Sequence, residues 1–293
     1  MNDHRIEFFN ALQSGGVGPA SPSALVADGL LHRHRIEGDK PGSLNGWHVL
    51  HLDSPASGAG GSWKAGHSVK WCSKRLSALT APERALLSQR IEEDKRRAQE
   101  ATEARHRDAA AKAARIWTDA APASPRHPYL ERKGIAPGIA RQSGASLVLP
   151  VVDFSGALHG LQFIDEQGGK RFISGTAKQG HFIPTGKAPD GTRPLYIAEG
   201  WATAATIQAM RPNVCTIAAC DAGNLPSVAT AARRTWGGVP IIIAPDFDKV
   251  GQEKGREACT QVGGHWLPTP ADLPTSCTDW NDWRQFQRQG VAS

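Results

Sequence analysis

Two short apolar runs, each followed directly by acidic residues, constrain the fold of this sequence more than any other feature. The first run is Leu195–Ala198, and it leads into Glu199. The second run is Ile241–Ala244, and it leads into Asp246 and Asp248. Continuous apolar runs that alternate with helical patterns are typical of buried strands in a parallel α/β sheet. Because ligands bind at the carboxyl ends of such strands, we expect the acidic side chains to lie at one edge of the sheet.

Acidic side chains at one edge of the sheet indicate a cation-binding site. Carboxylates at short distance repel one another unless a positive charge neutralises them. Hard oxygen ligands of this kind suit Mg²⁺ or Mn²⁺. We therefore predict that Glu199, Asp246 and Asp248 hold a divalent metal ion.

The segments around these residues resemble a known family. A strand that ends in Glu-Gly and a later strand that ends in Asp-x-Asp are similar to the Toprim domain of bacterial-type primases, type IA and type II topoisomerases and certain nucleases. The ordered segments PLYIAEGWATAATI, AACDAGNLPSVA, IIIAPDFDKVGQEKGREAC and TDWNDW resemble the Toprim primases of plasmids and phages. The resemblance implies a Rossmann-like catalytic Toprim domain with a parallel sheet at residues 191–293.

The segment before the Toprim region is similar to a further part of the same family. LVLPVVDFSGALHGLQFID and GKRFISGTAKQGHFIPTG resemble the small β-containing subdomain that precedes Toprim in bacterial-type primases, here residues 122–190. The resemblance implies that basic residues face nucleotide and DNA template. The candidates are Lys170, Arg171, Lys178 and Lys187, together with Lys249 from the Toprim region. Because adjacent strand residues point to opposite faces, only one of Lys170 and Arg171 can face the site.

A later acidic pair, Asp279 and Asp282, has two interpretations. In the family a late acidic pair contributes to the metal site, so the resemblance implies that both residues are metal ligands. The alternative is that Thr278 and Asp279 only cap the last helix. Asp221 and Asn224 follow another predicted strand and could touch metal or phosphate, although turn formation is the simpler explanation.

Residues 1–121 differ in character from the rest of the chain. Residues 1–77 are rich in Gly, Ser, Trp and His, with turn signals between short alternating runs, which predicts a small β-rich unit. Residues 78–121 begin with a capping box and are dense in Ala, Glu, Arg and Lys, which predicts a long helical connector. We interpret the histidines of residues 1–77, with His32 and His34 among them, as surface residues, because no ligand-spaced Cys and His set accompanies them. The tryptophans there either line a surface that tracks a single nucleic-acid strand or form a core.

Composition limits the kinds of partner and the cellular compartment that we expect. The 5 cysteines include no C-x-x-C pair, so we expect reduced thiols and no zinc. A net charge of +6 favours a polyanionic partner. Since no apolar run approaches the length of a membrane span and the N-terminus lacks a signal pattern, we expect a cytoplasmic protein without a membrane partner.

These observations predict a DNA primase-like nucleotidyltransferase, a DNA-directed RNA polymerase of Toprim type that acts in plasmid or phage replication. It would make short RNA primers from ribonucleoside triphosphates on a single-stranded DNA template, with Mg²⁺ or Mn²⁺ and with Glu199 as metal ligand or general base. The sequence carries neither a zinc-binding module nor a helicase phosphate loop. A separate helicase or zinc-binding protein could therefore be a partner.

Other functions fit the sequence less well. A Toprim nuclease would use the same carboxylates, but such nucleases lack the primase-like segment 147–187. A non-catalytic DNA-binding or regulatory module derived from a primase is a further alternative, against which the three intact carboxylates argue. A topoisomerase would need a tyrosine nucleophile, and the only tyrosines are Tyr129 and Tyr196, the second of which lies inside a predicted strand.

Overall fold

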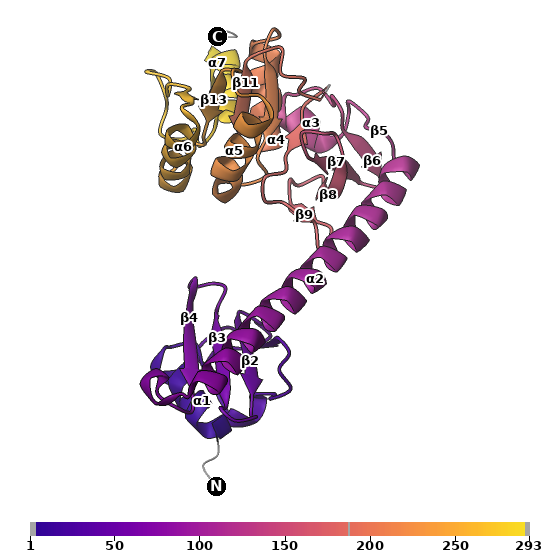
Figure 1. Cartoon of the computed structure of the whole chain (residues 1–293). Helices are drawn as coiled ribbons and strands as arrows, with labels where there is room; N and C mark the ends of the chain where they lie inside the picture. The colour runs from indigo at the N-terminus through magenta and orange to yellow at the C-terminus, as the bar shows by residue number, and fades with distance from the viewer. Residues whose placement is uncertain (1–3, 187, 291–293) are drawn as a thin grey trace. The chain divides into compact units, whose positions relative to one another are not determined.

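The chain divides into two units between Thr102 and Glu103, and one helix, α2 (Ala81–Asp119), contributes residues to both (Figure 1). The computed structural model describes residues 4–186 and 188–290, so that Lys187, a predicted binding residue, lies outside the described residues. None of the helices in these ranges combines the length and the apolar character that a membrane span requires.

One helix and an antiparallel sheet in the order β1-β2-β3-β4 form the N-terminal unit. Its elements are α1 (His4–Ser14), η1 (Pro22–Ala24), β1 (His32–His34), β2 (Gly46–His51), β3 (Ser57–Ser62), β4 (His67–Cys72) and η2 (Leu76–Ala78). A Cβ atom at Gly58 would meet the Phe8 ring at 3.0 Å, and one at Gly60 would meet Leu12 at 2.7 Å. Glycines in β3 therefore let the apolar side chains of α1 pack directly on the sheet.

Two histidines of this unit are buried, so the interpretation of them as surface residues is wrong. His34 is 4% exposed and His48 is 0% exposed. The Val26 amide donates to His48 Nε2, so His48 Nδ1 carries the proton and donates to His34 Nδ1 at 3.1 Å. His34 Nε2 in turn donates to the Val17 carbonyl at 2.9 Å. Burial lowers the pKa of both rings. The pKa of His48 falls to about 4, since the neighbouring rings of His34 and His32 add to the effect of burial.

The tryptophans of the N-terminal unit differ in burial, and a role for them in tracking nucleic acid stays a prediction. Trp71 packs against Phe8, whose side chain is in the core, with ring centroids 5.7 Å apart. Trp63 is 50% exposed, and the Arg33 guanidinium lies over its ring at 4.7 Å. The core interpretation therefore holds for Trp71, and Trp63 lies on the surface.

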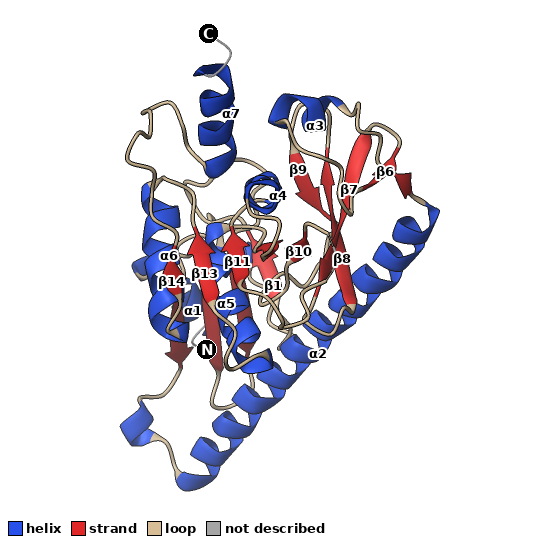
Figure 2. Cartoon of the chain, turned by 90° about the horizontal axis from the view of Figure 1, so that it is seen from above, coloured by secondary structure: helices blue, strands red, loops and turns tan. Residues whose placement is uncertain are grey.

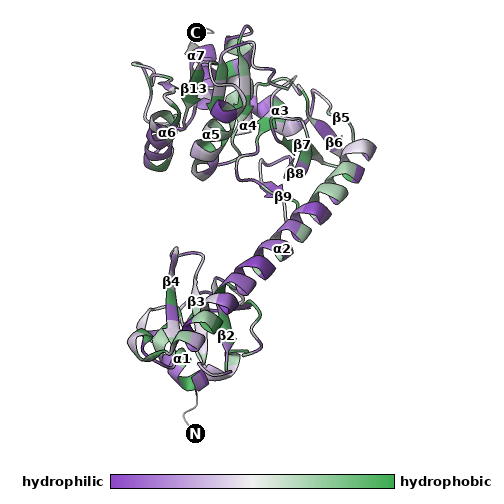
Figure 3. Cartoon of the chain, in the orientation of Figure 1, coloured by the Kyte–Doolittle hydropathy of each residue, from purple (hydrophilic) through white to green (hydrophobic). Residues whose placement is uncertain are grey.

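Helix α2 is continuous over 39 residues, as its composition predicts. It begins with the expected capping box, in which the Thr80 amide donates to the Glu83 carboxylate at 2.9 Å. Much of the helix is hydrophilic (Figure 3). Towards its end Ala109 and Ala113 are buried against Val148 of the C-terminal unit, where their small side chains allow close packing.

An antiparallel sheet opens the C-terminal unit, in the order β5-β6-β7-β8-β9. The strands are β5 (Ala121–Pro122), β6 (Arg141–Ser143), β7 (Ser146–Val152), β8 (Leu158–Ile164) and β9 (Lys170–Phe172). The short helix α3 (Pro128–Lys133) separates the first two strands in sequence. β7 and β8 pair as an antiparallel hairpin, which the turn at residues 153–156 connects.

A mostly parallel sheet follows, in the order β10-β12-β11-β13-β14. The strands are β10 (Ile183–Pro184), β11 (Leu195–Ala198), β12 (Cys215–Ala218), β13 (Ile241–Ala244) and β14 (His265–Trp266). β11 pairs in parallel with both β12 and β13, and β11 and β13 lie side by side in Figure 2. Because the chain builds outwards from β11 in both directions, the carboxyl end of β11 is a topological switch point, where α/β sheets bind ligands.

Helices cover both faces of the parallel sheet. They are α4 (Trp201–Met210), η3 (Ala222–Asn224), α5 (Leu225–Thr235), α6 (Lys249–Val262) and α7 (Trp280–Gly290). One apolar core contains Trp201 of α4 and Ala198 of β11. The other contains Val228 of α5, Ala258 of α6 and Ile197 of β11, so that neighbouring β11 residues face opposite cores. The predicted α/β class is therefore confirmed, whereas the four-part domain division made from the sequence stays a prediction.

Candidate functional site

Glu199 directly follows β11 at the switch point of the parallel sheet. The residue is 8% exposed, and its Oε1 accepts a hydrogen bond from the Asp246 amide at 2.9 Å. Burial raises the pKa of Glu199, the bond from Asp246 opposes this shift, and the charge of Asp248 adds to it. The side chain of Glu199 thus joins the ends of β11 and β13.

Asp246, which follows β13, has a carboxylate oxygen without a partner. Its Oδ1 is buried and accepts no hydrogen bond from any of the described residues. Burial, and after it the charges of Glu199 and Asp279, raises the pKa of Asp246 to about 8, while Lys170 opposes the shift. A buried polar oxygen that lacks a partner carries a large desolvation cost. This set of oxygen donors fits a divalent cation, whose charge would offset both the burial and the mutual repulsion.

Asp248 and Gly251 form the start of α6. Asp248 caps the helix, because its Oδ1 accepts the Gly251 amide at 2.7 Å. A Cβ atom at Gly251 would overlap Glu199 Oε1 and would lie 2.9 Å from the Asp246 carbonyl oxygen. Only a glycine therefore lets α6 begin so close to the carboxylates. Gly251 was not among the site residues predicted from the sequence, although a glycine three positions after the second Asp was the signal for this approach.

Lys170 and Arg171 take opposite faces of β9, as the alternation of strand side chains predicts. A Cβ atom at Gly200, the residue after Glu199, would lie 3.7 Å from Lys170 Nζ. The Arg171 guanidinium lies instead over the Phe163 ring, 4.4 Å from its centroid. Lys170 is therefore the member of the pair that faces the carboxylates.

The sequence that carries these carboxylates matches a known family. Residues 194–290 match the family described as the Toprim domain. This segment is a Toprim domain. The resemblance predicted from the Glu-Gly and Asp-x-Asp motifs is thereby confirmed. Toprim domains bind divalent metals, in agreement with the oxygen donors at the end of β11 and β13.

The chain is also similar to curated and structurally known primases. Two Escherichia coli proteins, both named DNA primase TraC, are 34% identical, the first over 94% of this chain and 21% of its own length and the second over 88% and 26%. The chain thus spans about a fifth to a quarter of the length of these relatives. The crystal structure of the primase fragment of the bacteriophage T7 primase-helicase protein has a TM-score of 0.43 at 17% identity, over 56% of this chain and 72% of that chain.

Asp221 of the Toprim domain pairs with Lys178 from the preceding subdomain, with Nζ 2.8 Å from Oδ2. Its Oδ1 accepts the Asn224 amide at 3.1 Å and so caps η3, which is the simpler of the two expected roles. The buried Asn224 side chain bonds the loop before β10. It donates to the carbonyls of Lys178, His181 and Ala219 and accepts from the Gly180 amide. Asn224 thus fixes the loop that carries Lys178 towards the Toprim domain.

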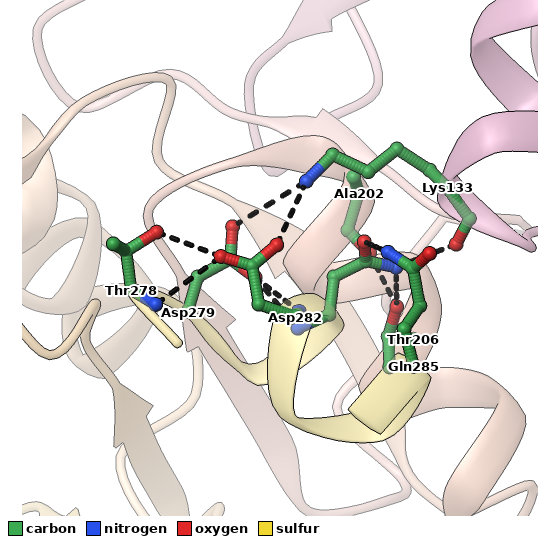
Figure 4. A network of polar contacts seen from close by, with 8 residues as sticks. Lys133, Ala202, Thr206, Thr278, Asp279, Asp282 and Gln285 are labelled. Atoms are coloured by element: carbon green, nitrogen blue, oxygen red, sulfur yellow. Dashed lines mark hydrogen bonds and ion pairs between the residues drawn. The ribbon is translucent and has the colours of Figure 1, made fainter. Parts of the chain in front are cut away.

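Asp279 and Asp282 of the Toprim domain have partners within the fold (Figure 4). Asp279 Oδ1 accepts the amides of Asn281 and Asp282, which is the predicted capping role. Asp282 Oδ2 accepts from the Thr278 amide and hydroxyl, and Lys133 Nζ lies 3.2 Å from Asp282 Oδ1 and 4.0 Å from Asp279 Oδ2. A metal ion bound by Asp282 would have to displace the Lys133 ammonium group. The role of Asp279 and Asp282 as metal ligands therefore stays a prediction.

The remaining predicted residue, Lys249, is not drawn into the carboxylate cluster. Its side chain is 88% exposed, and its Nζ lies 3.9 Å from Glu253. It stands next to Asp248 at the first turn of α6, where a long exposed side chain can reach a ligand from solution.

Sequence reasoning missed a strained residue at the end of β12. Cys220 has φ of 76°, a left-handed conformation that side chains rarely adopt, and it immediately precedes Asp221. Residues held in such conformations cluster at functional sites. Burial raises the pKa of Cys220 to about 12, so its thiol stays protonated and is not a nucleophile. The left-handed turn at Cys220 directly precedes Asp221, whose carboxylate pairs with Lys178.

Proposed function

We propose that this chain carries the catalytic region of a DNA primase-like nucleotidyltransferase, which makes short RNA primers on single-stranded DNA from ribonucleoside triphosphates. The observation that carries the proposal is the buried, unpartnered Oδ1 of Asp246 beside the carboxylate of Glu199. The 34% identity to proteins named DNA primase TraC supports primer synthesis as the reaction.

The acidic residues would bind the cation and orient it. Glu199, Asp246 and Asp248 would hold Mg²⁺ or Mn²⁺, whose charge would neutralise the triphosphate and favour ionisation of an attacking 3′-hydroxyl. Asp246 contributes its free Oδ1, and Asp248 contributes the oxygen that does not cap α6. Because Glu199 Oε1 is held by the Asp246 amide, the position of the Glu199 carboxylate is coupled to the backbone of Asp246.

Two side chains would handle protons and phosphate charge. Glu199, at the carboxyl end of β11 and bonded to the Asp246 amide, could accept the proton of the attacking hydroxyl as a general base. Lys170 lies beside Gly200 and would bind phosphate oxygens of the nucleotide. Lys178 and Lys249, which lie nearer the surface, would hold the template or the triphosphate.

Single-stranded DNA and ribonucleoside triphosphates are the proposed ligands, in plasmid or phage replication in the cytoplasm. A helicase or a zinc-binding protein is the proposed partner, since primase-like proteins of this kind are often fused to such modules. The proposed chemistry at Glu199 and Asp246 is the same whether the helicase or zinc-binding module is a separate protein or part of the same polypeptide.

The test compares the wild-type chain with the Asp246→Ala/Asp248→Ala double variant. Each is incubated with single-stranded DNA, labelled ribonucleotides and Mg²⁺ or Mn²⁺, and thermal unfolding is measured with and without the cation. We expect labelled oligonucleotides, and stabilisation by the cation, from the wild-type chain alone. Synthesis by the double variant would refute the site. Cation-dependent degradation of the DNA without synthesis would indicate a nuclease, and cation binding without either reaction would indicate a binding module.

A further inference from the structure

One carboxylate and two imidazoles gather outside the Toprim carboxylates. Asp153, His159 and His181 each offer a ligand atom, and these atoms lie within 4.8 Å of one another. Asp153 follows β7, His159 lies in β8 and His181 precedes β10, so only the fold brings them together. All three side chains are partly exposed, so solvent ions can reach the cluster.

The turn after β7 presents a single oxygen of Asp153 to the cluster. Oδ1 is occupied by the Ser155 amide at 2.8 Å, the Ser155 hydroxyl at 2.6 Å and the Ala157 amide at 3.0 Å. Oδ2 faces His159 Nε2 at 2.8 Å. The carboxylate is therefore fixed by one oxygen and available through the other, which is how ligating carboxylates are commonly held.

His181 is held in the tautomer that a metal ligand needs. Its Nδ1 lies 2.8 Å from the Ala177 carbonyl oxygen. Because a carbonyl can only accept, Nδ1 carries the proton and Nε2 keeps its lone pair. An imidazole that donates from one nitrogen to a backbone carbonyl and binds metal through the other is the usual arrangement at metal sites.

The imidazole rings of His159 and His181 are stacked, so they cannot both bind one ion in their present orientation. Their centroids are 3.9 Å apart and their planes differ by 18°. Nearly parallel rings cannot both contain one ion in their planes, so one ring has to turn. His181 is anchored through Ala177, so we expect His159 to turn as the ion takes the place of its hydrogen bond to Asp153, with the ring proton moving to Nδ1.

We propose that Asp153, His159 and His181 form a structural site for Zn²⁺, with water completing the coordination. Two imidazoles and one carboxylate suit Zn²⁺ better than Mg²⁺, which prefers oxygen donors only. The expectation of no zinc rested on cysteine spacing, and this ligand set contains no cysteine.

A bound ion would join the β7–β8 hairpin to the loop before β10. That loop carries Lys178, which pairs with Asp221, and it is bonded by Asn224. The ion would therefore stabilise the junction between the antiparallel sheet and the Toprim domain. This role does not depend on the proposed primase activity.

Zinc binding by the full chain tests the proposal. Calorimetric titration with Zn²⁺ is compared for wild type, His159→Gln and His181→Gln. The matched control is His32→Gln, since His32 also pairs with a carboxylate, that of Asp28 at 2.9 Å. We expect one tight site per chain, lost or weakened about 10-fold or more in both cluster variants and unchanged in the control.

A second measurement separates this site from the Toprim carboxylates and guards against misfolding. Zn²⁺ should raise the thermal midpoint of wild type and of Asp246→Asn, but of neither cluster variant, with circular dichroism confirming that each is folded. Co²⁺ bound to wild type should show the strong visible absorption of a tetrahedral site. The proposal is overturned if wild type binds no Zn²⁺ tightly, or if folded His159→Gln binds as well as wild type.

Discussion

Replacing Gly251 with alanine should separate Glu199 from the end of β13. The added Cβ atom would overlap Glu199 Oε1 and would lie 2.9 Å from the Asp246 carbonyl oxygen, whereas ordinary contacts begin at 3.4 Å. The Asp246 carbonyl belongs to the backbone and accepts a hydrogen bond from the Gln252 side chain, so it is the Glu199 carboxylate that has to move, by about 1 Å. That movement breaks the 2.9 Å hydrogen bond from the Asp246 amide.

The cost follows from three contributions. A lost hydrogen bond to a charged group costs about 1.5–3 kcal/mol, and the inserted methyl group costs about 1–3 kcal/mol in overpacking. Alanine returns about 1 kcal/mol through its higher helix propensity. We therefore expect Gly251→Ala to lower the free energy of unfolding by about 1.5–5 kcal/mol and to weaken divalent-metal binding.

Denaturant unfolding and Mg²⁺ titration of Gly251→Ala measure both effects. The matched control is Gly237→Ala, because a Cβ atom there would meet no atom within 4 Å. The control should unfold and bind metal as wild type does. If Gly251→Ala has wild-type stability and wild-type metal affinity, the close approach of α6 to Glu199 does not matter and the reasoning is refuted.

Three further predictions concern other residues. Lys170→Met should lower primer synthesis roughly 10- to 100-fold, whereas Arg171→Met on the opposite face should change it little; equal losses in a primer assay would contradict this orientation. His48 is kept neutral by burial, with its pKa lowered from 6.5 to about 4. The contribution of neutral His48 to the free energy of unfolding is therefore complete above pH 6.5. It should fall by about 3 kcal/mol as the pH drops to about 4. Urea unfolding of His48→Gln should show no such contribution from position 48. Lys133→Met should cost about 1 kcal/mol in unfolding experiments by removing the partner of Asp282, and it should tighten Mg²⁺ binding only if Asp282 is a metal ligand.

Local patterns were sufficient to predict the strands that carry the candidate site. The apolar runs 195–198 and 241–244 coincide with β11 and β13, since a strand buried on both faces needs apolar residues at every position. The alternation of side chains along β9 showed that Lys170 and Arg171 must diverge. It could not show which of them faces the carboxylates, because that depends on where β9 lies relative to the other sheet.

Contacts between distant segments could not be predicted in this way. Lys133 bonds to Asp282, although the two residues are 149 positions apart in the sequence. The residues around one of them give no indication of the other. Polar residue type also misled the interpretation of His34 and His48, which are buried because each satisfies the other. A pattern of polar and apolar residues predicts which side chains are buried only where the polar ones have no hydrogen-bond partner in the protein interior.

Strand β10 limits how the Toprim domain can be excised. It pairs with β12, while Phe182 just before it bridges to Val152 at the end of β7, so one short segment belongs to both sheets. A fragment that began at residue 191 would leave β12 as an open edge, with the 0% exposed side chain of Ile217 uncovered. Such a fragment should aggregate by adding strands from other copies. A soluble Toprim fragment would have to start before Lys178. It would then contain both the carboxylates and the loop whose Lys178 pairs with Asp221.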